Sequence, residues 1–469
     1  MGKYFGTDGI RGVAGEKLDA ELAFKIGRAA ATVLVQAGNQ QRPPVLDNRQ
    51  VTDDEPVVGR HPKVIIGRDT RISCDMLEAA MSAGLCSAGA DVTLLGILPT
   101  PAVAYITVKT EADMGVVISA SHNPFEHNGI KMFGSDGYKL DDTLEEYIER
   151  LIDDETGVIK KTGGNLGRIV RDHAGWTNEY VKFLVGASAG GRYRGRIAID
   201  CANGAASETA RLLFRQLHAE FEIIADEPDG VNINVDCGST HLNYLADMMK
   251  TGRFDIGIAF DGDADRCQLV DEKGAKVDGD MILAVMAHHM KKSGALKNNA
   301  FVGTVVSNAG MEIFARENGF EFHRADVGDR NVLEMMKKLD CNLGGESSGH
   351  IIFTDIMTTG DGQLTAVKFL DLLNTSGRTV SELVSDVPRL PQVMPSFKLS
   401  GGEKQRDAIM SHPRLAEEVN KQEALLEGSG RILIRPSGTE PIIRVLVEAK
   451  TEALSIKIAE NILDLMKTL

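Results

Sequence analysis

Three aspartates occupy alternate positions, Asp261, Asp263 and Asp265, directly after the apolar run 256–260. In an extended segment alternate side chains lie on one face, so the three carboxylates are expected to converge. Converging carboxylates repel and raise one another's pKa, and a hard divalent cation bound by oxygen removes that repulsion. The pattern therefore predicts a Mg²⁺ site. For any one of these aspartates taken singly, helix capping or contact with water would be the better explanation.

A calcium-binding EF-hand is the specific alternative for these aspartates. Glu272 stands at the twelfth loop position when Asp261 is counted as the first. However, the sixth position holds Arg266, where the sharp turn of an EF-hand requires glycine. Leu269 and Val270 also continue a strand-like apolar pattern where a flanking helix is needed. The sequence therefore favours a magnesium site at the end of a strand.

A second polar segment, residues 119–124, contains Ser121 followed by His122. An ordinary serine is a weak nucleophile, whereas a phosphorylated serine is a dianion that needs a cation and hydrogen-bond donors nearby. The aspartate site would supply that cation. On this segment alone, a turn or helix-capping serine explains the pattern equally well.

A third polar segment, residues 344–350, contains Glu346, Ser348 and His350 among glycines. If the segment is extended, Glu346 and Ser348 share a face and offer an acceptor and a donor to sugar hydroxyls. Glycines would allow a ligand to approach the backbone closely. The alternative is a polar turn with a structural histidine.

Two further segments could bind anions. The segment 6–12 has three glycines around Arg11, but it matches neither the P-loop nor the dinucleotide-binding fingerprint. Near the C-terminus, guanidinium groups, hydroxyls and a glycine-containing turn together predict a phosphate site. Its residues are Arg435, Ser437, Gly438, Thr439 and Arg444.

The elements around these segments form a repeat. Short apolar strands alternate with helical stretches, and in each of three repeats a third strand leads directly into a polar, glycine-containing segment. These third strands are expected at 115–118, 256–260 and 341–343. Alternating strands and helices predict βαβ units, and ligands bind beyond the carboxyl ends of parallel strands. Three equivalent loops are therefore expected to face one shared cleft.

The expected fold class is α/β, with three related βαβ-type mixed-sheet domains and a smaller C-terminal α+β domain around a central cleft. The expected domains are 1–178 with the serine loop, 179–277 with the metal loop, 278–390 with the sugar loop and 391–469 with the phosphate loop. Prolines predict a linker over 386–396, followed by a helix over 402–425, two strands and a final helix. Residues 40–62 are expected to form a surface loop.

The composition excludes several classes of protein. The chain has 469 residues, 43% of them hydrophobic, which is too long for one core and suggests three or four domains. A net charge of −15 argues against nonspecific binding to nucleic acid or anionic membranes. Six widely spaced cysteines predict reduced thiols, and no apolar run of membrane-spanning length or signal-peptide pattern is found. A cytoplasmic location is expected.

Together the four loops, in this order, resemble the α-D-phosphohexomutase superfamily over essentially the whole chain. The segments 6–12 and 118–124 resemble the bacterial branch that acts on glucosamine phosphates more than the glucose and mannose branches. Ser347 stands where glutamine is common in that branch.

The resemblance implies a role for each candidate residue. Ser121 would be phosphorylated in the resting enzyme and would bind Mg²⁺ together with Asp261, Asp263 and Asp265. The catalytic residues would be Ser121, Arg11 near the transferred phosphate, Lys131 as general base and His350 as its acid/base partner. His122 and Arg266 would lie in the same centre. The sugar would contact Glu346 and Ser348, and the phosphate that is not reacting would contact Arg435, Ser437, Gly438, Thr439 and Arg444.

The implied reaction interconverts glucosamine 6-phosphate and glucosamine 1-phosphate, with Mg²⁺ as cofactor and glucosamine 1,6-bisphosphate as intermediate and activator. Burial beside Mg²⁺ is expected to lower the pKa of Lys131 enough for it to act as a base. The implied partners are hexosamine phosphates and a kinase or bisphosphate that primes Ser121, with a homodimer left open and neither nucleic acid nor membrane expected. The alternatives are a glucose or mannose phosphomutase, a phosphatase that uses the same serine, and a noncatalytic sugar-phosphate sensor.

Overall fold

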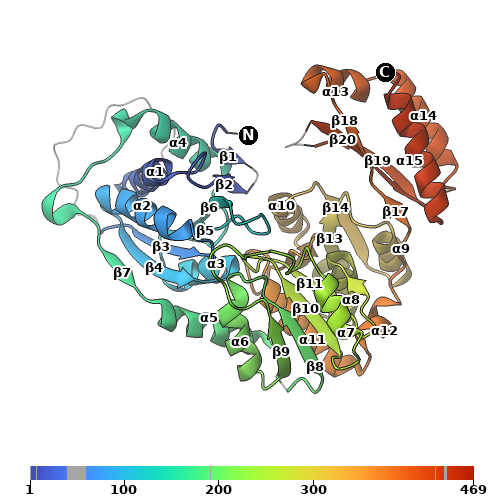
Figure 1. Cartoon of the computed structure of the whole chain (residues 1–469), viewed down its shortest axis with the longest axis horizontal. Coiled ribbons are helices and arrows are strands. Elements are labelled where there is room, and N and C mark those ends of the chain that lie inside the picture. Colours follow the sequence, from blue (N-terminus) through green and yellow to red (C-terminus); the bar gives the residue numbers. More distant parts are fainter. Residues whose placement is uncertain (1, 7, 40–59, 191, 428, 438–440) are drawn as a thin grey trace.

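A computed structural model describes residues 2–6, 8–39, 60–190, 192–427, 429–437 and 441–469. Within this part of the chain four β-sheets form, and one lies in each of the four expected domains. Figure 1 shows the domains arranged in an arc, with domain 1 (blue) at one end, domain 4 (red) at the other, and domains 2 and 3 between them. The loop expected at 40–62 falls almost wholly outside the described residues.

The first three sheets share a four-stranded unit. In domain 1 its strands are β3 (Lys63–Arg68), β4 (Asp91–Ile97), β5 (Met114–Ile118) and β6 (His127–Gly134). In domain 2 they are β8 (Arg196–Asp200), β9 (Glu220–Ile224), β10 (Ile256–Phe260) and β11 (Cys267–Val270). In domain 3 they are β13 (Ala300–Thr304), β14 (Glu321–Ala325), β15 (Leu343–Gly345) and β16 (Ile351–Phe353).

In each unit the first strand lies between the second and the third, and these three strands are parallel. The fourth strand returns antiparallel beside the third. The three polar segments are the connections between the third and fourth strands. Because equivalent connections emerge from the same edge of each unit, the topology places them where they can meet.

Additional strands extend the first two sheets. These are β1 (Phe5–Gly6), β2 (Gly9–Val13) and β7 (Ile169–Arg171) in domain 1, and β12 (Lys276–Val277) in domain 2. The strand β2 pairs antiparallel with β6, with Arg11 opposite Gly129. This pairing brings the glycine-rich segment near the N-terminus to the strand that contains Lys131.

Helices surround the sheets of domains 1 to 3 (Figure 1). In domain 1 they are α1 (Ala20–Asn39), α2 (Cys74–Ser87), α3 (Thr100–Lys109) and α4 (Asp142–Asp153), with α5 (His173–Ala187) leading into domain 2. Domain 2 adds α6 (Ala206–Gln216) and α7 (Asn243–Met249), and domain 3 adds α8 (Gly279–Lys292), α9 (Gly310–Glu317), α10 (Asp329–Leu339), α11 (Gly362–Ser376) and α12 (Val380–Val384). The domain boundary expected at residue 178 falls inside α5.

One continuous apolar core joins domains 1, 2 and 3. Its buried members include Leu95 of domain 1, Phe260 of domain 2 and Phe301 of domain 3. Between them, Tyr180 of α5 donates a hydrogen bond to Asp361 Oδ2 (2.8 Å), the carboxylate that also caps α11 through Leu364 N. Domain 4 has a separate core that includes Ile409, Ile443 and Ile458. Domains 1 to 3 are therefore joined by a common core and each also has a smaller cluster of its own, whereas the core of domain 4 is separate.

Domain 4 differs in two places from the sequence expectation. The expected helix over 402–425 is interrupted, because Pro413 has no N–H to donate within a helix and instead begins a second one. The helices are α13 (Gly402–Met410), α14 (Pro413–Ala424) and α15 (Glu452–Met466). Part of the expected linker is also strand: β17 (Gln392–Val393) and β18 (Ser396–Lys398) pair with β20 (Ile442–Glu448), which pairs on its other edge with β19 (Arg431–Pro436).

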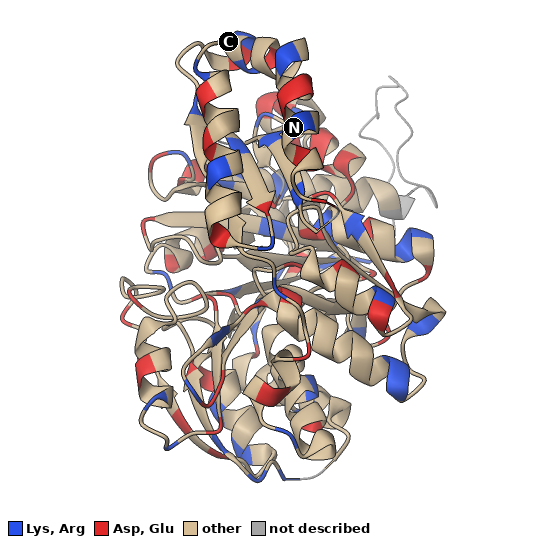
Figure 2. Ribbon diagram, turned by 90° about the vertical axis from the view of Figure 1, so that its right-hand side faces the viewer, with Lys and Arg blue, Asp and Glu red and all other residues tan. Residues whose placement is uncertain are grey.

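The surface has the mixed charge of the sequence. Figure 2 shows acidic and basic residues interspersed along the elements in that view. Among the helices of the described residues, none combines the length and apolar character required to span a membrane. All six cysteines lie in the described residues and are unpaired, as the sequence predicts.

Candidate active site

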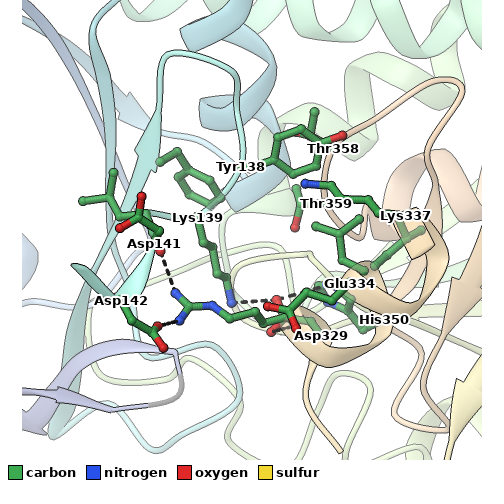
Figure 3. Close-up of a pocket in the computed structure, with 15 residues that line it drawn as sticks. Tyr138, Lys139, Asp141, Asp142, Asp329, Glu334, Lys337, His350, Thr358 and Thr359 are labelled. Atoms are coloured by element: carbon green, nitrogen blue, oxygen red, sulfur yellow. Dashed lines mark hydrogen bonds and ion pairs between the residues drawn. The ribbon is translucent and has the colours of Figure 1, made fainter. Parts of the chain in front are cut away.

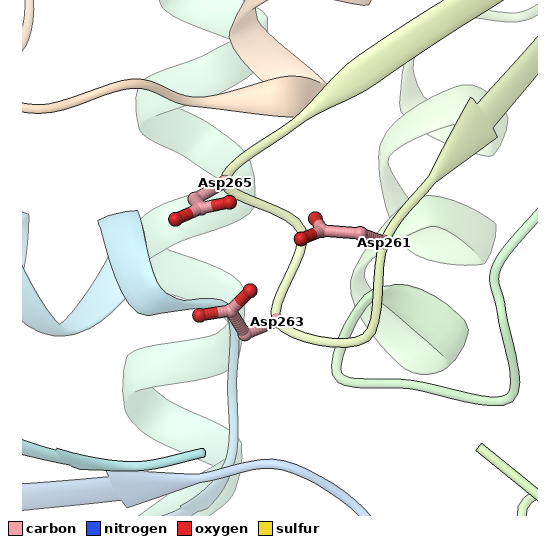
Figure 4. Close-up of side chains that lie close together, drawn as sticks. All are labelled: Asp261, Asp263 and Asp265. Carbon is pink, nitrogen blue, oxygen red and sulfur yellow. The ribbon is translucent and has the colours of Figure 1, made fainter. Parts of the chain in front are cut away.

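The three aspartates converge in the loop between β10 and β11, as Figure 4 shows. One carboxylate oxygen from each of Asp261, Asp263 and Asp265 lies within 4.8 Å of the others, and all three residues are buried. The backbone differs from the extended segment that was expected. It forms a turn in which Ala264 has a φ of 55°, and the Ala264 N–H donates to the Asp261 carbonyl (3.0 Å).

The donor set fits a hard cation. Two buried carboxylate oxygens, Asp263 Oδ1 and Asp265 Oδ1, have no hydrogen-bond partner among the described residues. Burial, with the charges of Asp265 and Asp263, raises the pKa of Asp261 well above its usual value. An oxygen-coordinated divalent cation would satisfy the unpaired oxygens and remove the repulsion.

Ser121 lies directly beside this triplet, in the loop between β5 and β6. It is buried, and its Oγ donates to Asp261 Oδ2 (2.6 Å) across the boundary of domains 1 and 2. Its φ of 52° is in the left-handed region, which costs a non-glycine residue about 1–2 kcal/mol. The proximity of this hydroxyl to the aspartates is the central geometric requirement of a phosphoserine bound to the same cation.

Lys131 enters the centre from β6. Its Nζ donates to Asp263 Oδ2 (2.9 Å) and also lies 3.2 Å from Asp8 Oδ2 and 3.7 Å from Asp265 Oδ2. Burial opposes the charge on Lys131, but the carboxylates of Asp263, Asp8 and Asp265 outweigh it and raise its pKa. The lowered pKa expected for Lys131 depends on a bound Mg²⁺ and stays a prediction.

Arg11 and Arg266 bring positive charge to the centre, and His122 lies beside Arg266. Arg11 pairs with Asp8, and its Nε is buried without a hydrogen-bond partner among the described residues. Arg266 Nη1 lies 3.0 Å from His122 Nδ1, and its Nε lies 3.8 Å from Asp265 Oδ1. Burial, with the charges of Arg266 and Arg11, lowers the pKa of His122 to about 4. The ring of His122 is therefore neutral near pH 7.

The third polar segment is a hairpin turn between β15 and β16, where an extended stretch was expected. Glu346 accepts from Gly328 N (3.0 Å), and Ser348 Oγ is buried without a hydrogen-bond partner in the described part of the chain. His350 Nδ1 lies 3.6 Å from Asp265 Oδ2, and Gly360 N donates to Nε2 (3.1 Å). These contacts favour the tautomer with its proton on Nδ1.

A network of charged residues that sequence reasoning missed connects domains 1 and 3. Lys139 pairs with Asp8 and lies 2.6 Å from Asp329 Oδ2, which itself lies 3.8 Å from His350 Nε2. Asp8 lies close to Arg11 in the sequence, and Lys139 lies close to Lys131; this nearness was the only signal in the sequence that could have found them. Asp329 is the first residue of α10.

This network borders a pocket of about 350 Å³ between the segment after β6 and the helix α10 (Figure 3). Tyr138 and Lys139 line it on one side, and Asp329, Lys337 and His350 line it on the other. Because Lys139 contacts Asp8 and His350 contacts Asp265, this pocket lies next to the aspartate centre, between domains 1 and 3.

The predicted phosphate-binding residues lie in domain 4, apart from the residues contributed by domains 1 to 3. Arg435 and Arg444 are directly opposite each other on β19 and β20. Burial, with the charge of Arg444, lowers the pKa of Arg435, and its Nε is buried without a hydrogen-bond partner in the described chain. Directly opposed like charges are unfavourable unless an anion lies between them. Ser437 follows the strand β19, whereas Gly438 and Thr439 lie outside the described residues.

Four family models match the chain in order. They describe domains I, II and III, each α/β/α, and the C-terminal domain of phosphoglucomutase/phosphomannomutase, and they match residues 2–46 with 52–158, 178–274, 278–390 and 397–465. The chain belongs to the phosphoglucomutase/phosphomannomutase family of α-D-phosphohexomutases.

Within that family, its curated relatives include enzymes named phosphoglucosamine mutase. The one from Shouchella clausii is 46% identical over 467 residues, which cover 100% of this chain and 99% of the relative. The one from Desulforudis audaxviator is 46% identical and covers 98% and 97%.

Solved structures share the fold. A phosphoglucomutase/phosphomannomutase family protein from Burkholderia thailandensis has a TM-score of 0.76 at 24% identity and covers 99% of this chain and 97% of its own. An N-acetylphosphoglucosamine mutase from Aspergillus fumigatus, solved in complex with GlcNAc-6P and magnesium, has a TM-score of 0.58 at 17% identity and covers 78% and 92%.

Proposed function

We propose that this chain interconverts glucosamine 6-phosphate and glucosamine 1-phosphate through a phosphorylated Ser121. The names of its curated relatives, phosphoglucosamine mutases, support this reaction. The contact of Ser121 Oγ with Asp261 Oδ2 (2.6 Å) carries this proposal, because it joins the phosphoryl carrier to the cation site. The reaction provides an amino-sugar 1-phosphate, the form from which UDP-N-acetylglucosamine and cell-wall precursors are made.

In the first step, the phosphoryl group moves from Ser121 Oγ to O1 of glucosamine 6-phosphate. As the bond from phosphorus to O1 forms and the bond from phosphorus to Oγ breaks, neutral Lys131 takes the O1 proton and passes it to Ser121 Oγ. The products are glucosamine 1,6-bisphosphate and a serine hydroxyl. In the second step Ser121 Oγ gives its proton to Lys131 as it attacks the 6-phosphoryl group, and O6 takes that proton as its bond to phosphorus breaks, which leaves glucosamine 1-phosphate. The intermediate must reorient between the two steps.

The residues around Ser121 support this chemistry. Arg11, Lys131 and Arg266 bring positive charge to a buried centre, where stabilisation of a transferring phosphoryl group is strong. Mg²⁺ held by Asp261, Asp263, Asp265 and the phosphoserine would neutralise charge on the transferring group. With the cation present, less negative charge would face Lys131, which favours its role as the base.

Binding of the sugar and of the second phosphate completes the proposal. Glu346 and Ser348 would bind sugar hydroxyls, and His350 would hold a proton beside Asp265. The opposed Arg435 and Arg444, with Ser437, Gly438 and Thr439, would bind the phosphate that is not reacting. Priming of Ser121 by the bisphosphate or by a kinase, and assembly into a homodimer, belong to the same proposal.

Intact mass and a coupled assay test the function. Glucosamine 6-phosphate with catalytic glucosamine 1,6-bisphosphate should give glucosamine 1-phosphate, and one phosphoryl group should map to Ser121. Ser121→Ala should remove both signals. Release of inorganic phosphate in place of product would indicate a phosphatase, and an unphosphorylated Ser121 with binding alone would indicate a sensor. Higher kcat/KM on glucose or mannose 6-phosphate would reassign the substrate.

A further inference from the structure

The main-chain carbonyl of Ser121 is bound by two buried side chains from different domains. Arg71 Nη2 donates to it at 2.8 Å, and Asn234 Nδ2 donates to it at 2.9 Å. The same two nitrogens also donate to the main-chain carbonyl of Asn123, at 2.9 Å from Arg71 and 3.1 Å from Asn234. Arg71 comes from the loop after β3 in domain 1, and Asn234 comes from the long loop after β9 in domain 2.

Arg71 supports the serine loop more widely. It is 1% exposed, and its guanidinium also donates to the carbonyls of Pro124 and His127. Asp69, which is fully buried, accepts from Arg71 Nε (2.8 Å) and from Ser119 Oγ (2.6 Å). Burying an arginine is favourable only when its charge and donors are satisfied, and here the serine loop satisfies most of them.

The segment that contains Arg71 is also attached to domain 2, through the residues on either side of Arg71. Thr70 Oγ1 donates to the Asn203 carbonyl (2.6 Å), and Ile72 N donates to the Gly230 carbonyl (2.9 Å). Gly262, between the first two aspartates, packs so closely that an added Cβ would lie 2.6 Å from the Ser121 carbonyl oxygen. The Ser121 carbonyl is therefore enclosed by both domains that form the centre.

These contacts bear directly on the backbone conformation of Ser121. Its φ of 52° is unfavourable for a residue with a side chain, so the surrounding contacts must maintain it. Two donors that fix the carbonyl direction also fix the peptide plane, and with it the direction of Oγ toward Asp261. Misplacing a reacting group by about 1 Å can cost about 100-fold in rate.

We propose that Arg71 and Asn234 are positioning residues that hold Ser121 in the conformation required for phosphoryl transfer. Because Asn234 belongs to the domain that supplies the aspartates, its bond makes the aim of the serine depend on correct docking of domains 1 and 2. This inference rests on the proposed function, since it concerns the residue that carries the phosphoryl group.

The decisive substitution is Asn234→Gly, with Asp236→Gly as the matched control. Both residues lie in the same loop with left-handed backbones, φ 61° and 53°, so glycine introduces no strain at either position. Asn234 binds Ser121, whereas the Asp236 side chain is exposed. A purely structural role would lower the Tm and leave kcat per folded molecule unchanged.

The measurements are kcat and KM for glucosamine 6-phosphate, Tm, and phosphoryl transfer from glucosamine 1,6-bisphosphate to Ser121 followed by intact mass. For Asn234→Gly we expect kcat and transfer to fall about 100-fold, with KM within about twofold of wild type and a Tm close to that of Asp236→Gly. Arg71→Lys should also lose kcat, because an ammonium cannot reproduce the planar set of donors.

Equal kcat in Asn234→Gly and Asp236→Gly would overturn the inference. If Asn234→Gly does not fold, Asn234→Asp decides, since it keeps the size of the side chain and replaces its donor by a carboxylate oxygen. Full kcat in that variant would also overturn the inference. A wild-type chain that transfers no phosphoryl group would instead refute the proposed function, so the two failures are distinguishable.

Discussion

Lys131 Nζ donates a 2.9 Å hydrogen bond to Asp263 Oδ2, although the two residues are 132 positions apart and belong to different domains. Both side chains are buried, at 2% and 1% exposure. The pair therefore links the strand that follows the serine loop to the predicted cation ligands. Binding of a cation to the aspartates would therefore change the net charge around Lys131.

Replacing Lys131 with Met should lower kcat by about 10²- to 10⁴-fold, the usual contribution of a general acid or base. Without Mg²⁺ the variant should also be less stable by about 3–5 kcal/mol, because a buried carboxylate loses its partner. Added Mg²⁺ should then raise its Tm more than it raises that of wild type. Calorimetry with and without Mg²⁺ measures this, and Lys109→Met, which removes an exposed ion pair with Glu179, is the control. Equal Mg²⁺-dependent shifts would contradict the expected charge balance.

Removing the metal should abolish turnover and lower stability. Chelation leaves three buried carboxylates facing one another, whereas Mg²⁺ at 100 times its Kd should stabilise the fold by about 2.7 kcal/mol. Asp265→Asn should greatly reduce this Mg²⁺-dependent rise in Tm. Asp247→Asn, an exposed change in the same domain, should preserve it. A full rise in the Asp265 variant would place the ion elsewhere.

Asp280 should make stability dependent on pH. Burial, with the charge of Asp278, raises its pKa from 3.8 to about 7, and its Oδ2 accepts from Asn308 N (2.8 Å). Because the folded-state pKa is raised, the protonated form stabilises the fold fully below the unfolded pKa. That stabilisation is lost as the pH rises through about 7, by on the order of 4 kcal/mol.

Asp280→Asn should therefore remove this loss between about pH 4 and 7. Denaturant unfolding at successive pH values measures it, and Asp386→Asn, an exposed substitution, controls for the change in net charge. Parallel stability profiles for wild type and Asp280→Asn would show that Asp280 does not titrate in this range.

Arg435→Met should separate phosphate binding from stability. KM for the sugar phosphate should rise about 10- to 100-fold, equivalent to losing about 1.5–3 kcal/mol from a hydrogen bond to a charged group. The Tm should stay level or rise, because Arg435 directly opposes Arg444 on the neighbouring strand. Arg406→Met, on the exposed helix α13, is the control. A large fall in Tm with unchanged KM would indicate a structural role.

The three polar loops could be located from the sequence because each follows a short apolar strand, and the period of a strand can be read from the types of its side chains. Some of the fourth strands, such as Ile351–Phe353, could not be located because three residues are too few to show a period. The aspartate segment was also expected to be extended, which is not the case. The turn with Ala264 in a left-handed conformation brings the carboxylates together equally well, so the convergence was predicted but the backbone was not.

The residues that connect the domains could not be predicted from the sequence, for a different reason. Arg71, Asn234 and Asp329 lie in loops or at a helix start, where side-chain periodicity carries no information. Their partners are far away in the chain: Asn234 binds the carbonyl of Ser121, 113 positions away, and Asp329 pairs with Lys139 of domain 1. Such pairings depend on how the sheets pack against each other, and one chain alone does not encode them in a readable pattern.

The recurrence of one strand order in three consecutive sheets suggests a division of labour. Each copy keeps the same scaffold and varies the short connection at one edge. In the proposed function, one connection would carry the phosphoryl group, another would hold the cation and the third would face the sugar. Substitutions within a single connection would then change the sugar selectivity and leave the shared core of domains 1 to 3 intact. Selectivity and folding stability could therefore evolve separately in this fold.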